Sequence, residues 1–460
     1  MAASDASDLG GFAGEPSRGV TPPGGPLDRA DGDGRLLIGA SLVLAFSAVG
    51  FLVQTFGIFS AAIESSFGWS RTATYSVLTI ATLLAPVLIP LTGWAADRLN
   101  LRVLVLASLG VQTASLLALG AIPVGQVGFS LLFLVTYAAS FGASTVPLAK
   151  AVGAAFSRRR GAALGILFAG ACLGAIVNPL VAGALVAGVG WQGAFLAFGV
   201  QTALLAGVPA LLLIRSHPRT ARPHDEPPTG TTGAAEVVQA IQTTRAPTAA
   251  GRPDGWRTLF RTRNLYVIIG WGFFAALGYG GMQSHLVPLL EERMHSSAEA
   301  VIGQSLLGAG LLIGNLVAGL LLDRIPTRPL ASLMLAVPIA AMLALALVPA
   351  GAADIAITTA IGIATGTETA MLAYVVSRYL PAAVSGRALS IGLVAVALGG
   401  GISTLIGAAA HDATGGYELF LVLGAGALAV AAVWPWGLRG PGGLAGVPRR
   451  RGGERDEARV

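Results

Sequence analysis

Three ionisable side chains, Lys150, His285 and Glu368, lie within long apolar stretches of the sequence. If those stretches cross a membrane, a charge at that depth is costly and by default marks a transport pathway or a pairing site. Glu368 belongs to the run GTET at 366–369. It lies about ten residues from the nearer end of its stretch, too deep for a side chain to reach water easily. Glu368 is therefore the best candidate for binding a proton, and a structural hydrogen bond is the alternative.

Lys150 and His285 each have two interpretations. Lys150 lies near one end of its stretch, so it could either face a charged solute or extend its amine to the membrane surface. His285 carries an imidazole that titrates near neutral pH, which suits proton coupling or contact with a solute. A packed histidine is an equally good explanation.

Three amide side chains, Gln54, Gln283 and Asn315, also lie within apolar stretches. Each could give a solute neutral hydrogen bonds. Amides in membrane helices also bond to neighbouring helices, and that alternative stays open for all three.

The composition places these residues in a membrane protein. Of the 460 residues 54% are hydrophobic and 11% charged, whereas soluble chains carry about 25% charged residues. Mean hydropathy is +0.73. A membrane span needs roughly 20 mainly apolar residues and must satisfy its own backbone hydrogen bonds, so the repeated apolar stretches are predicted to be helices. The net charge of +6 lies in short clusters between these stretches, which argues against one basic face for nucleic acid.

Twelve helical spans are predicted, in two sets of six. The first set is expected at 36–62, 74–95, 103–122, 127–155, 161–187 and 193–214, and the second at 265–290, 299–322, 329–349, 353–376, 388–410 and 417–437. These sets make an N-terminal bundle at 36–214 and a C-terminal bundle at 263–438. Residues 215–262, rich in Pro, Thr and Arg, are predicted to be a flexible linker. Residues 1–35 and 439–460 are predicted to be disordered tails.

The basic residues in the short loops predict the orientation, because cytoplasmic loops are enriched in Lys and Arg. Nine arginines fall on one side of the predicted helices and two, Arg71 and Arg293, on the other. The side with nine, together with the linker and both termini, is assigned to the cytoplasm. A single lysine among 29 basic residues is typical of a GC-rich bacterial genome, so a bacterial inner membrane is expected.

Two loops on that side repeat one motif. GWAADRLNLR at 93–102 and GLLLDRIPTR at 319–328 both read Gly-x-x-x-Asp-Arg-x-x-x-Arg, and the same offset of 226 residues relates Arg160-Gly161-Ala162 approximately to Gly386-Arg387-Ala388. This repeat predicts a duplication, an architecture that forms solute sites between its halves. The motif residues are Gly93, Asp97, Arg98, Arg102, Gly319, Asp323, Arg324 and Arg328.

These motif residues are expected to form a cytoplasmic gate. A carboxylate such as Asp97 or Asp323 at a helix end can pair with an arginine or a helix N-terminus, and glycine permits close helix approach. Such contacts, made when one side closes and broken when it opens, would act as a latch. The alternative is that they only fix topology and contact lipid headgroups.

At these loops the chain resembles the major facilitator superfamily, over about 36–437. FGWSR at 67–71, FSRRRGAALGILFAGACLG at 156–174, GWQGAF at 190–195, HLVPLLEE at 285–292 and SRYL at 377–380 are similar to the monocarboxylate porter and oxalate/formate exchanger branch. The resemblance implies that spans one, four, seven and ten line a cavity. It also implies an arginine for the solute carboxylate where this chain has Asn315. Lys150 is then the only amine that could replace it.

The function expected is proton-coupled or exchange transport of a small organic solute, with a monocarboxylate favoured, by a monomer without cofactor or metal. No phosphate-binding Gly-x-x-x-x-Gly-Lys-Ser/Thr loop occurs, so ATP coupling within the chain is not expected. Three alternatives remain: an exporter of larger hydrophobic compounds on the same fold, a membrane receptor that does not transport, and a membrane enzyme. Two intact motif loops favour a cycling transporter over a receptor.

Overall fold

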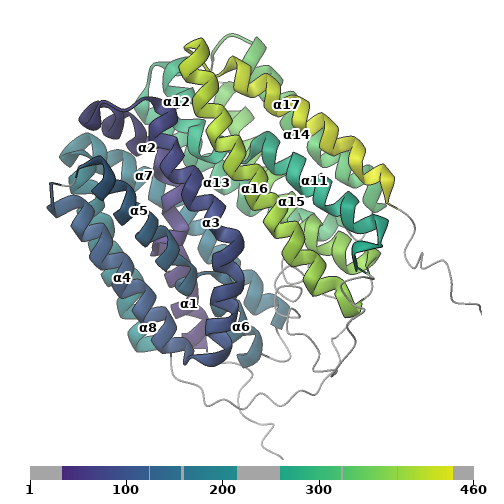
Figure 1. Cartoon of the computed structure of the whole chain (residues 1–460), viewed down its shortest axis with the longest axis horizontal. Coiled ribbons are helices and arrows are strands. Elements are labelled where there is room, and N and C mark those ends of the chain that lie inside the picture. The colour runs from purple at the N-terminus through teal and green to yellow at the C-terminus, as the bar shows by residue number, and fades with distance from the viewer. Residues whose placement is uncertain are drawn as a thin grey trace, which may run out of the picture.

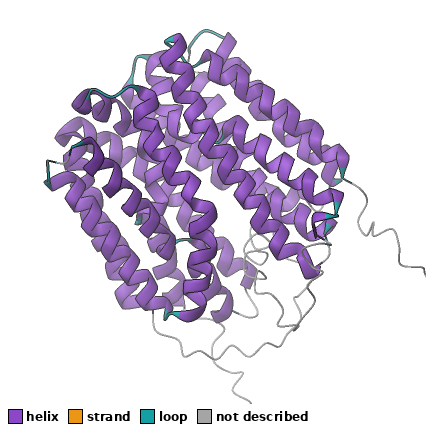
Figure 2. Ribbon diagram, in the orientation of Figure 1, coloured by secondary structure: helices purple, strands orange, loops and turns teal. Residues whose placement is uncertain are grey.

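The computed structural model describes residues 34–123, 125–156, 160–214, 259–322, 325–351, 353–380 and 382–438. Within these ranges the chain is helical, with short connections and no strand (Figure 2). The predicted tails at 1–35 and 439–460 and the predicted linker at 215–262 lie almost entirely outside the described residues.

The N-terminal set contains six spans. Its helices are α1 (Gly34–Phe46), α2 (Ala48–Phe67), α3 (Arg71–Arg98), α4 (Leu101–Ala121), α5 (Gln126–Ser140), α6 (Thr145–Ala155), α7 (Arg160–Gln201) and α8 (Val208–Leu213), with a π-helical turn at Thr202–Gly207 before α8. The first span comprises α1 and α2, and the fourth comprises α5 and α6. The backbone turns at Gly190, whose φ of 74° is left-handed, so α7 contains the fifth span and the start of the sixth.

The C-terminal set also contains six spans. Its helices are α11 (Arg263–Tyr279), α12 (Met282–Met294), α13 (Ser297–Leu322), α14 (Thr327–Leu347), α15 (Ala353–Tyr379), α16 (Ala382–Thr414) and α17 (Glu418–Val433), followed by a 3-10 turn at Trp434–Gly437. Here α11 and α12 together form the seventh span.

The predicted fold class is confirmed. Ten described segments are long and apolar enough to cross a membrane, and one of them, Ala162–Leu213, is 52 residues long and contains two crossings because of the turn at Gly190. The ten segments therefore make eleven crossings, and helix α15, which is not one of these segments, makes the twelfth. Large apolar side chains such as Leu131, Leu212 and Leu333 are about 60% exposed on the outside of the protein (58%, 65% and 61%). In water such an apolar surface would make the protein aggregate, whereas the hydrocarbon of a membrane solvates it favourably.

Each set of helices has its own packed interior. Buried residues from 259 to 438 form one apolar cluster, whereas those of the N-terminal set form two, one around Val105 and Leu148 and one around Phe56 and Phe133. The cluster around Phe56 and Phe133 also includes Ala408 of α16, so it extends across the boundary between the two sets.

The first span is interrupted at Ser47, and side chains of other helices bond to the freed backbone. The Ala48 N–H donates to Gln112 Oε1 over 2.8 Å, and Asn178 Nδ2 donates to the Ala45 carbonyl over 2.9 Å. These bonds are required because backbone groups in hydrocarbon have no water to bond with. The interruption positions the start of α2, which carries Gln54.

The seventh span has a matching interruption at Gly280 and Gly281. The Gly281 N–H donates to Ser403 Oγ over 2.9 Å, so α16 supports the break. Helix α12, which carries Gln283 and His285, starts directly afterwards.

The two sets of helices meet at one end and diverge toward the other (Figure 1). We call the end where the chain leaves at Ile214 and returns at Leu259 the linker end, and the opposite end the far end. The helix pairs α3 and α16, α7 and α13, and α2 and α12 join the sets. Ser305 Oγ of α13, for example, donates to the Ile176 carbonyl of α7 over 2.6 Å.

Candidate functional site

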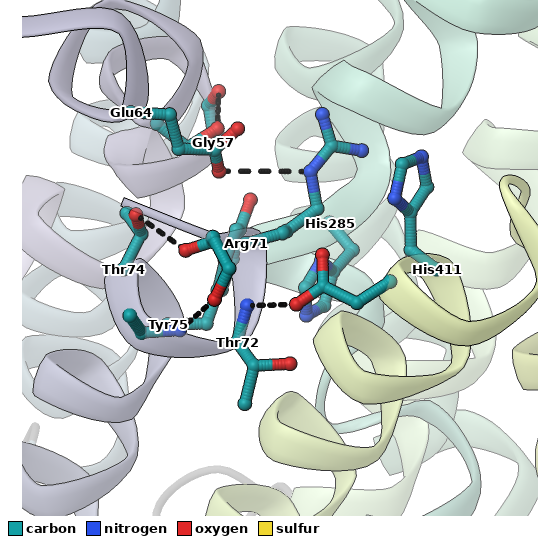
Figure 3. A network of polar contacts seen from close by, with 12 residues as sticks. Gly57, Glu64, Arg71, Thr72, Thr74, Tyr75, His285 and His411 are labelled. Carbon is teal, nitrogen blue, oxygen red and sulfur yellow. Dashed lines mark hydrogen bonds and ion pairs between the residues drawn. The ribbon is translucent and has the colours of Figure 1, made fainter. Parts of the chain in front are cut away.

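A network of polar side chains joins the two sets at the far end. We call it the interhalf network; its members are Glu64, Arg71, Thr72, Tyr75, His285, Glu292, His411, Asp412 and Tyr417. The first four come from the N-terminal set and the other five from the C-terminal set. Figure 3 shows Glu64, Arg71, Thr72, Tyr75, His285 and His411 of this network.

Arg71 is at the centre of this network. Ser70 accepts a bond from the Ala73 N–H and so caps α3, which begins at Arg71. Arg71 Nη1 donates to Glu292 Oε1 over 2.8 Å and to the Tyr417 hydroxyl over 3.1 Å, and its Nε lies 3.6 Å from Glu64 Oε1. Because the Arg71 side chain is only 14% exposed, its charge is balanced largely by these carboxylates.

Two further contacts extend the network to α16. His411 Nε2 lies 2.7 Å from Glu292 Oε1, and the Thr72 N–H donates to Asp412 Oδ2 over 2.8 Å. The Asp412 carboxylate thus faces the N-terminus of α3, where the helix dipole favours a negative charge. Three carboxylates therefore surround one arginine and one histidine.

Toward the membrane centre, Tyr75 of α3 lies against His285 of α12. Their rings are stacked, with centroids 3.9 Å apart and planes inclined by 19°. The Tyr75 hydroxyl donates to the Ser284 carbonyl over 3.0 Å. His285 is 0% exposed, and both ring nitrogens have partners, Nδ1 with the Tyr417 hydroxyl and Nε2 with the Thr404 carbonyl.

Two glycines allow this close approach. A Cβ at Gly407 would lie 2.7 Å from His285 Cδ2, and a Cβ at Gly57 would lie 2.9 Å from Pro288 Cδ. Any side chain at either position would push apart the helices that hold the network.

Three glutamines meet between the sets, nearer the centre. Gln304 of α13 donates through Nε2 to Gln54 Oε1 over 3.2 Å and to the Gln283 carbonyl over 3.1 Å. Gln304 is 0% exposed, and its Oε1 makes no hydrogen bond with a described residue. We call Gln54, Gln283 and Gln304 the central glutamines. The sequence analysis identified the first two and missed Gln304, which forms the contact between them.

Glu368 and Asn315 lie within the C-terminal set. Glu368 is 6% exposed, and its Oε1 has no hydrogen-bond partner among the residues described. Asn315 Nδ2 donates to the Leu311 carbonyl of its own helix over 2.9 Å. Neither side chain is hydrogen-bonded to the central glutamines in the described structure.

Lys150 lies toward the linker end, where it forms an ion pair with Asp97. The two side chains come from α6 and α3 of the same set and are 42% and 50% exposed. The structure thus places the predicted carboxylate partner beside the first motif loop, in contact with one of the predicted gate residues. Arg98 packs over the Trp94 ring at 4.6 Å, and Arg102 Nη2 donates to the Leu211 carbonyl over 2.7 Å.

The other predicted gate residues are only partly described. A Cβ at Gly93 would meet no atom within 4 Å, so no helix approaches Gly93 closely in this conformation. Arg328 bonds to the Leu438 carbonyl. Gly319 lies in α13, but its packing, together with Asp323 and Arg324, falls outside what the structure describes.

A groove of about 720 Å³ opens between α11 and α17 at the linker end. It is lined by Arg263, Tyr266, Val267, Ala429, Val430, Val433, Trp434 and Gly437. None of the predicted solute-binding residues lines it, so this groove is separate from the central glutamines.

Comparisons with known proteins agree with this architecture. A bacterial homologue of the human lysosomal transporter Spinster, in an inward-facing and unoccupied conformation, superimposes with a TM-score of 0.70 at 18% identity, over 88% of this chain and 96% of that one. The same homologue in an inward-facing and occupied conformation gives a TM-score of 0.64 at 18% identity, with the same coverage. At this identity the likeness shows the fold. Comparison with curated protein sequences finds no match.

The sequence model of the Major Facilitator Superfamily matches residues 40–361, which is more than half of the chain. The match begins within α1, covers the rest of the N-terminal set and ends within α15 of the C-terminal set. With this match, and with twelve spans in two sets of six among the described residues, the chain belongs to the Major Facilitator Superfamily of membrane transporters.

Proposed function

We propose that the chain is a secondary transporter that carries a small organic solute by alternating access. The observation that supports this most strongly is an asymmetry between the two ends. At the far end the interhalf network joins the sets through Arg71, Glu292 and Tyr417, whereas at the linker end Asp97 and Lys150 pair within one set and stay half-exposed. A contact that holds one end closed while the other is solvated is what a rocking mechanism requires.

The count of basic residues assigns the linker end to the cytoplasm. The far end then faces outside, and the structure represents a state closed to the outside. The two similar solved structures are both described as inward-facing, which supports this assignment. We further propose a monomer in a bacterial inner membrane, with both termini in the cytoplasm.

The central glutamines are proposed to bind the solute. They come from both sets and lie where α2 approaches α12 and α13. Gln304 Oε1 has no described partner, so it can accept a hydrogen bond that only a guest molecule or water would give. Amide groups of this kind suit hydroxyl, amide or carboxyl groups on a small solute.

Glu368 is proposed to bind the coupling proton. An ionised carboxylate buried in hydrocarbon without a partner is costly, and binding a proton removes that cost. Glu368 is buried, and its Oε1 has no described hydrogen-bond partner. Since Glu368 lies on α15, a helix implied to line the cavity, its protonation can respond to solute binding nearby.

We keep a monocarboxylate as the first solute class, on the sequence resemblance to that branch. The structure adds a condition to this proposal, because Lys150 is paired with Asp97. For Lys150 to bind a solute carboxylate, Asp97 has to release it during the cycle. Export of a larger hydrophobic compound is the second candidate, favoured by the pairing of Lys150 and by the neutral Asn315 in place of an arginine.

Uptake into proteoliposomes tests the proposal. Purified protein would be supplied with a panel of monocarboxylates and neutral analogues of similar size, with and without an imposed pH gradient. Saturable uptake of at least one small solute, driven by an inward proton gradient, is expected. Uptake that is confined to large apolar compounds would favour the exporter, and the absence of any gradient dependence would remove proton coupling.

A further inference from the structure

The hydrogen bonds around His285 determine which of its nitrogens carries hydrogen. Nε2 lies 2.8 Å from the Thr404 carbonyl, which can only accept, so Nε2 must be the donor. In a neutral imidazole the other nitrogen is then an acceptor. Nδ1 lies 3.2 Å from the Tyr417 hydroxyl, which donates its hydrogen to that lone pair.

The Tyr417 hydroxyl couples this histidine to the ion pairs of the network. Its oxygen accepts a bond from Arg71 Nη1 over 3.1 Å while its hydrogen is donated to His285. With a neutral His285, every donor in the series from Arg71 through Tyr417 and His285 to Thr404 therefore faces an acceptor.

A second proton on His285 would break this arrangement. Nδ1 would become a donor that faces the hydroxyl hydrogen of Tyr417, and that hydrogen would have to turn away to a place where no described acceptor lies. The imidazolium would also be 0% exposed, with neutral partners only, one oxygen away from the Arg71 cation. A buried charge without a counter-charge is strongly unfavourable.

We infer that His285 is the proton-binding residue of the outer gate, and that the gate closes only on its neutral form. The inference rests on the proposed alternating access, in which the far end opens and Tyr75 separates from His285. Opening exposes the imidazole to external water, where it can take up a proton. Because the open state then binds more protons than the closed state, acidification outside must favour the open state, by up to about tenfold per pH unit below about pH 6.5.

Other titratable and charged groups lie around His285 on each neighbouring element. They are Arg71 and Tyr75 on α3, Tyr417 before α17, His411 and Asp412 on α16, Glu64 on α2, and Glu291 and Glu292 on its own helix. Of these, His411 acts in the opposite direction. Its Nε2 lies 2.7 Å from Glu292, so its protonation creates an ion pair that favours closure. The wild-type response is therefore the sum of two opposed effects, and the test must separate them.

Distance measurement across the far end provides this test. The single native cysteine, Cys172, would be replaced by alanine, and spin labels attached at Ser65→Cys on α2 and Ser297→Cys on α13, both at exposed positions near the far end. The distribution of label distances, recorded by pulsed electron resonance in lipid nanodiscs between about pH 5 and 8, reports the fraction of open molecules.

Two backgrounds are compared, His411→Gln and the double variant His411→Gln/His285→Gln. Glutamine keeps an N–H that can donate to the Thr404 carbonyl but cannot take up a proton in this range. The single variant is expected to open on acidification, and the double variant to keep one open fraction throughout. A single variant that does not respond, or a double variant that opens as much as the single one, would overturn the assignment.

An Arg71→Ala variant distinguishes this outcome from failure of the transport proposal. If its far end opens while His411→Gln stays insensitive to pH, alternating access stands and the role of His285 is wrong. If the labels stay close together in every variant, including Arg71→Ala, the two ends do not alternate, and both proposals fail.

Discussion

The guanidinium of Arg71 and the carboxylate of Glu292 lie 2.8 Å apart, although 221 residues separate them in the sequence and they belong to opposite sets of helices. Glu292 also contacts His411, so one carboxylate joins α3, α12 and α16. In the proposed cycle this contact holds the far end closed and breaks when that end opens.

Glu292→Gln is expected to weaken closure. The variant keeps the size of the side chain but loses the charge that Arg71 and His411 face. Because Glu292 is 37% exposed, we expect a cost of about 1 kcal/mol, which is a rise of about fivefold in the ratio of open to closed molecules. The spin labels at Ser65→Cys and Ser297→Cys measure this ratio.

Glu291→Gln is the matched control, since it removes the same charge from the adjacent position on the same helix, and Glu291 forms no ion pair or side-chain hydrogen bond with the described network residues. Its open fraction should equal that of the wild type. Equal behaviour of the two variants would mean that the ion pair does not hold the gate.

Tyr75 is expected to contribute by two separable interactions. Tyr75→Phe keeps the ring on His285 but loses the bond to the Ser284 carbonyl, with a cost of about 1 kcal/mol. Tyr75→Ala loses the ring as well and should open the far end further. Tyr137→Phe in α5, away from the boundary, serves as control. The prediction is contradicted if the phenylalanine and alanine variants show the same distances as the control.

The spans could be predicted from sequence because the thickness of a bilayer sets their length. The predicted third span, 103–122, corresponds to α4 at Leu101–Ala121, and the predicted tenth, 353–376, to α15 at Ala353–Tyr379. The hydropathy of a continuous stretch of residues and the charges in the loops beside it are local properties of the sequence. These local properties are enough to define a span.

Contacts between helices could not be predicted in the same way. Lys150 and Asp97 pair because α6 packs against α3, and nothing near either residue in the sequence indicates it. Gln304 was missed because an amide in an apolar stretch gives no sign of the helix face that turns toward the other set. Arg71 entered the sequence analysis only as a loop charge, Glu292 only as the end of the run HLVPLLEE, and Asp412 not at all. One feature of the sequence could have indicated the network: acidic and basic residues both occur at predicted helix ends on the side that has few arginines.

Asp97→Asn is expected to reduce transport several-fold while leaving membrane insertion intact, because it removes the charge that Lys150 pairs with. Lys150→Gln should reduce transport of every solute to a similar extent if the pair acts as a unit, and the double variant should be no worse than either single one. Initial uptake rates normalised to protein in the membrane give the comparison, and Lys150→Arg is the control that keeps the charge.

A different pattern would assign Lys150 to the solute. Loss of carboxylate uptake with normal uptake of a neutral analogue in Lys150→Ala would show that the amine binds the anion. Unchanged uptake in Asp97→Asn would remove the latch role of the motif loop.

Glu368→Gln is expected to uncouple transport from protons. The amide is close in size to the acid and remains neutral at every pH, so the variant resembles a permanently protonated carrier. Accumulation driven by a pH gradient should be lost, whereas exchange of labelled for unlabelled solute at equal pH should continue. Glu299→Gln, at the exposed start of α13, is the control. A variant that still accumulates solute with the gradient would exclude Glu368 as the coupling residue.

Gln304 is expected to be a larger determinant of solute affinity than Gln54 or Gln283, because it alone contacts both and retains an acceptor without a described partner. Gln304→Leu removes the amide at similar volume and should weaken binding of a transported solute about tenfold, the equivalent of about 1.4 kcal/mol for one or two lost hydrogen bonds. Binding measured by calorimetry on detergent-purified protein separates this loss from any change in gating. Gln126→Leu, at an exposed far-end position on α5, controls for the loss of an amide elsewhere, since the Gln126 side chain donates only to the Phe67 carbonyl in the described structure. Equal affinity of the Gln304 and Gln126 variants would mean that the central glutamines join the helices without contacting the solute.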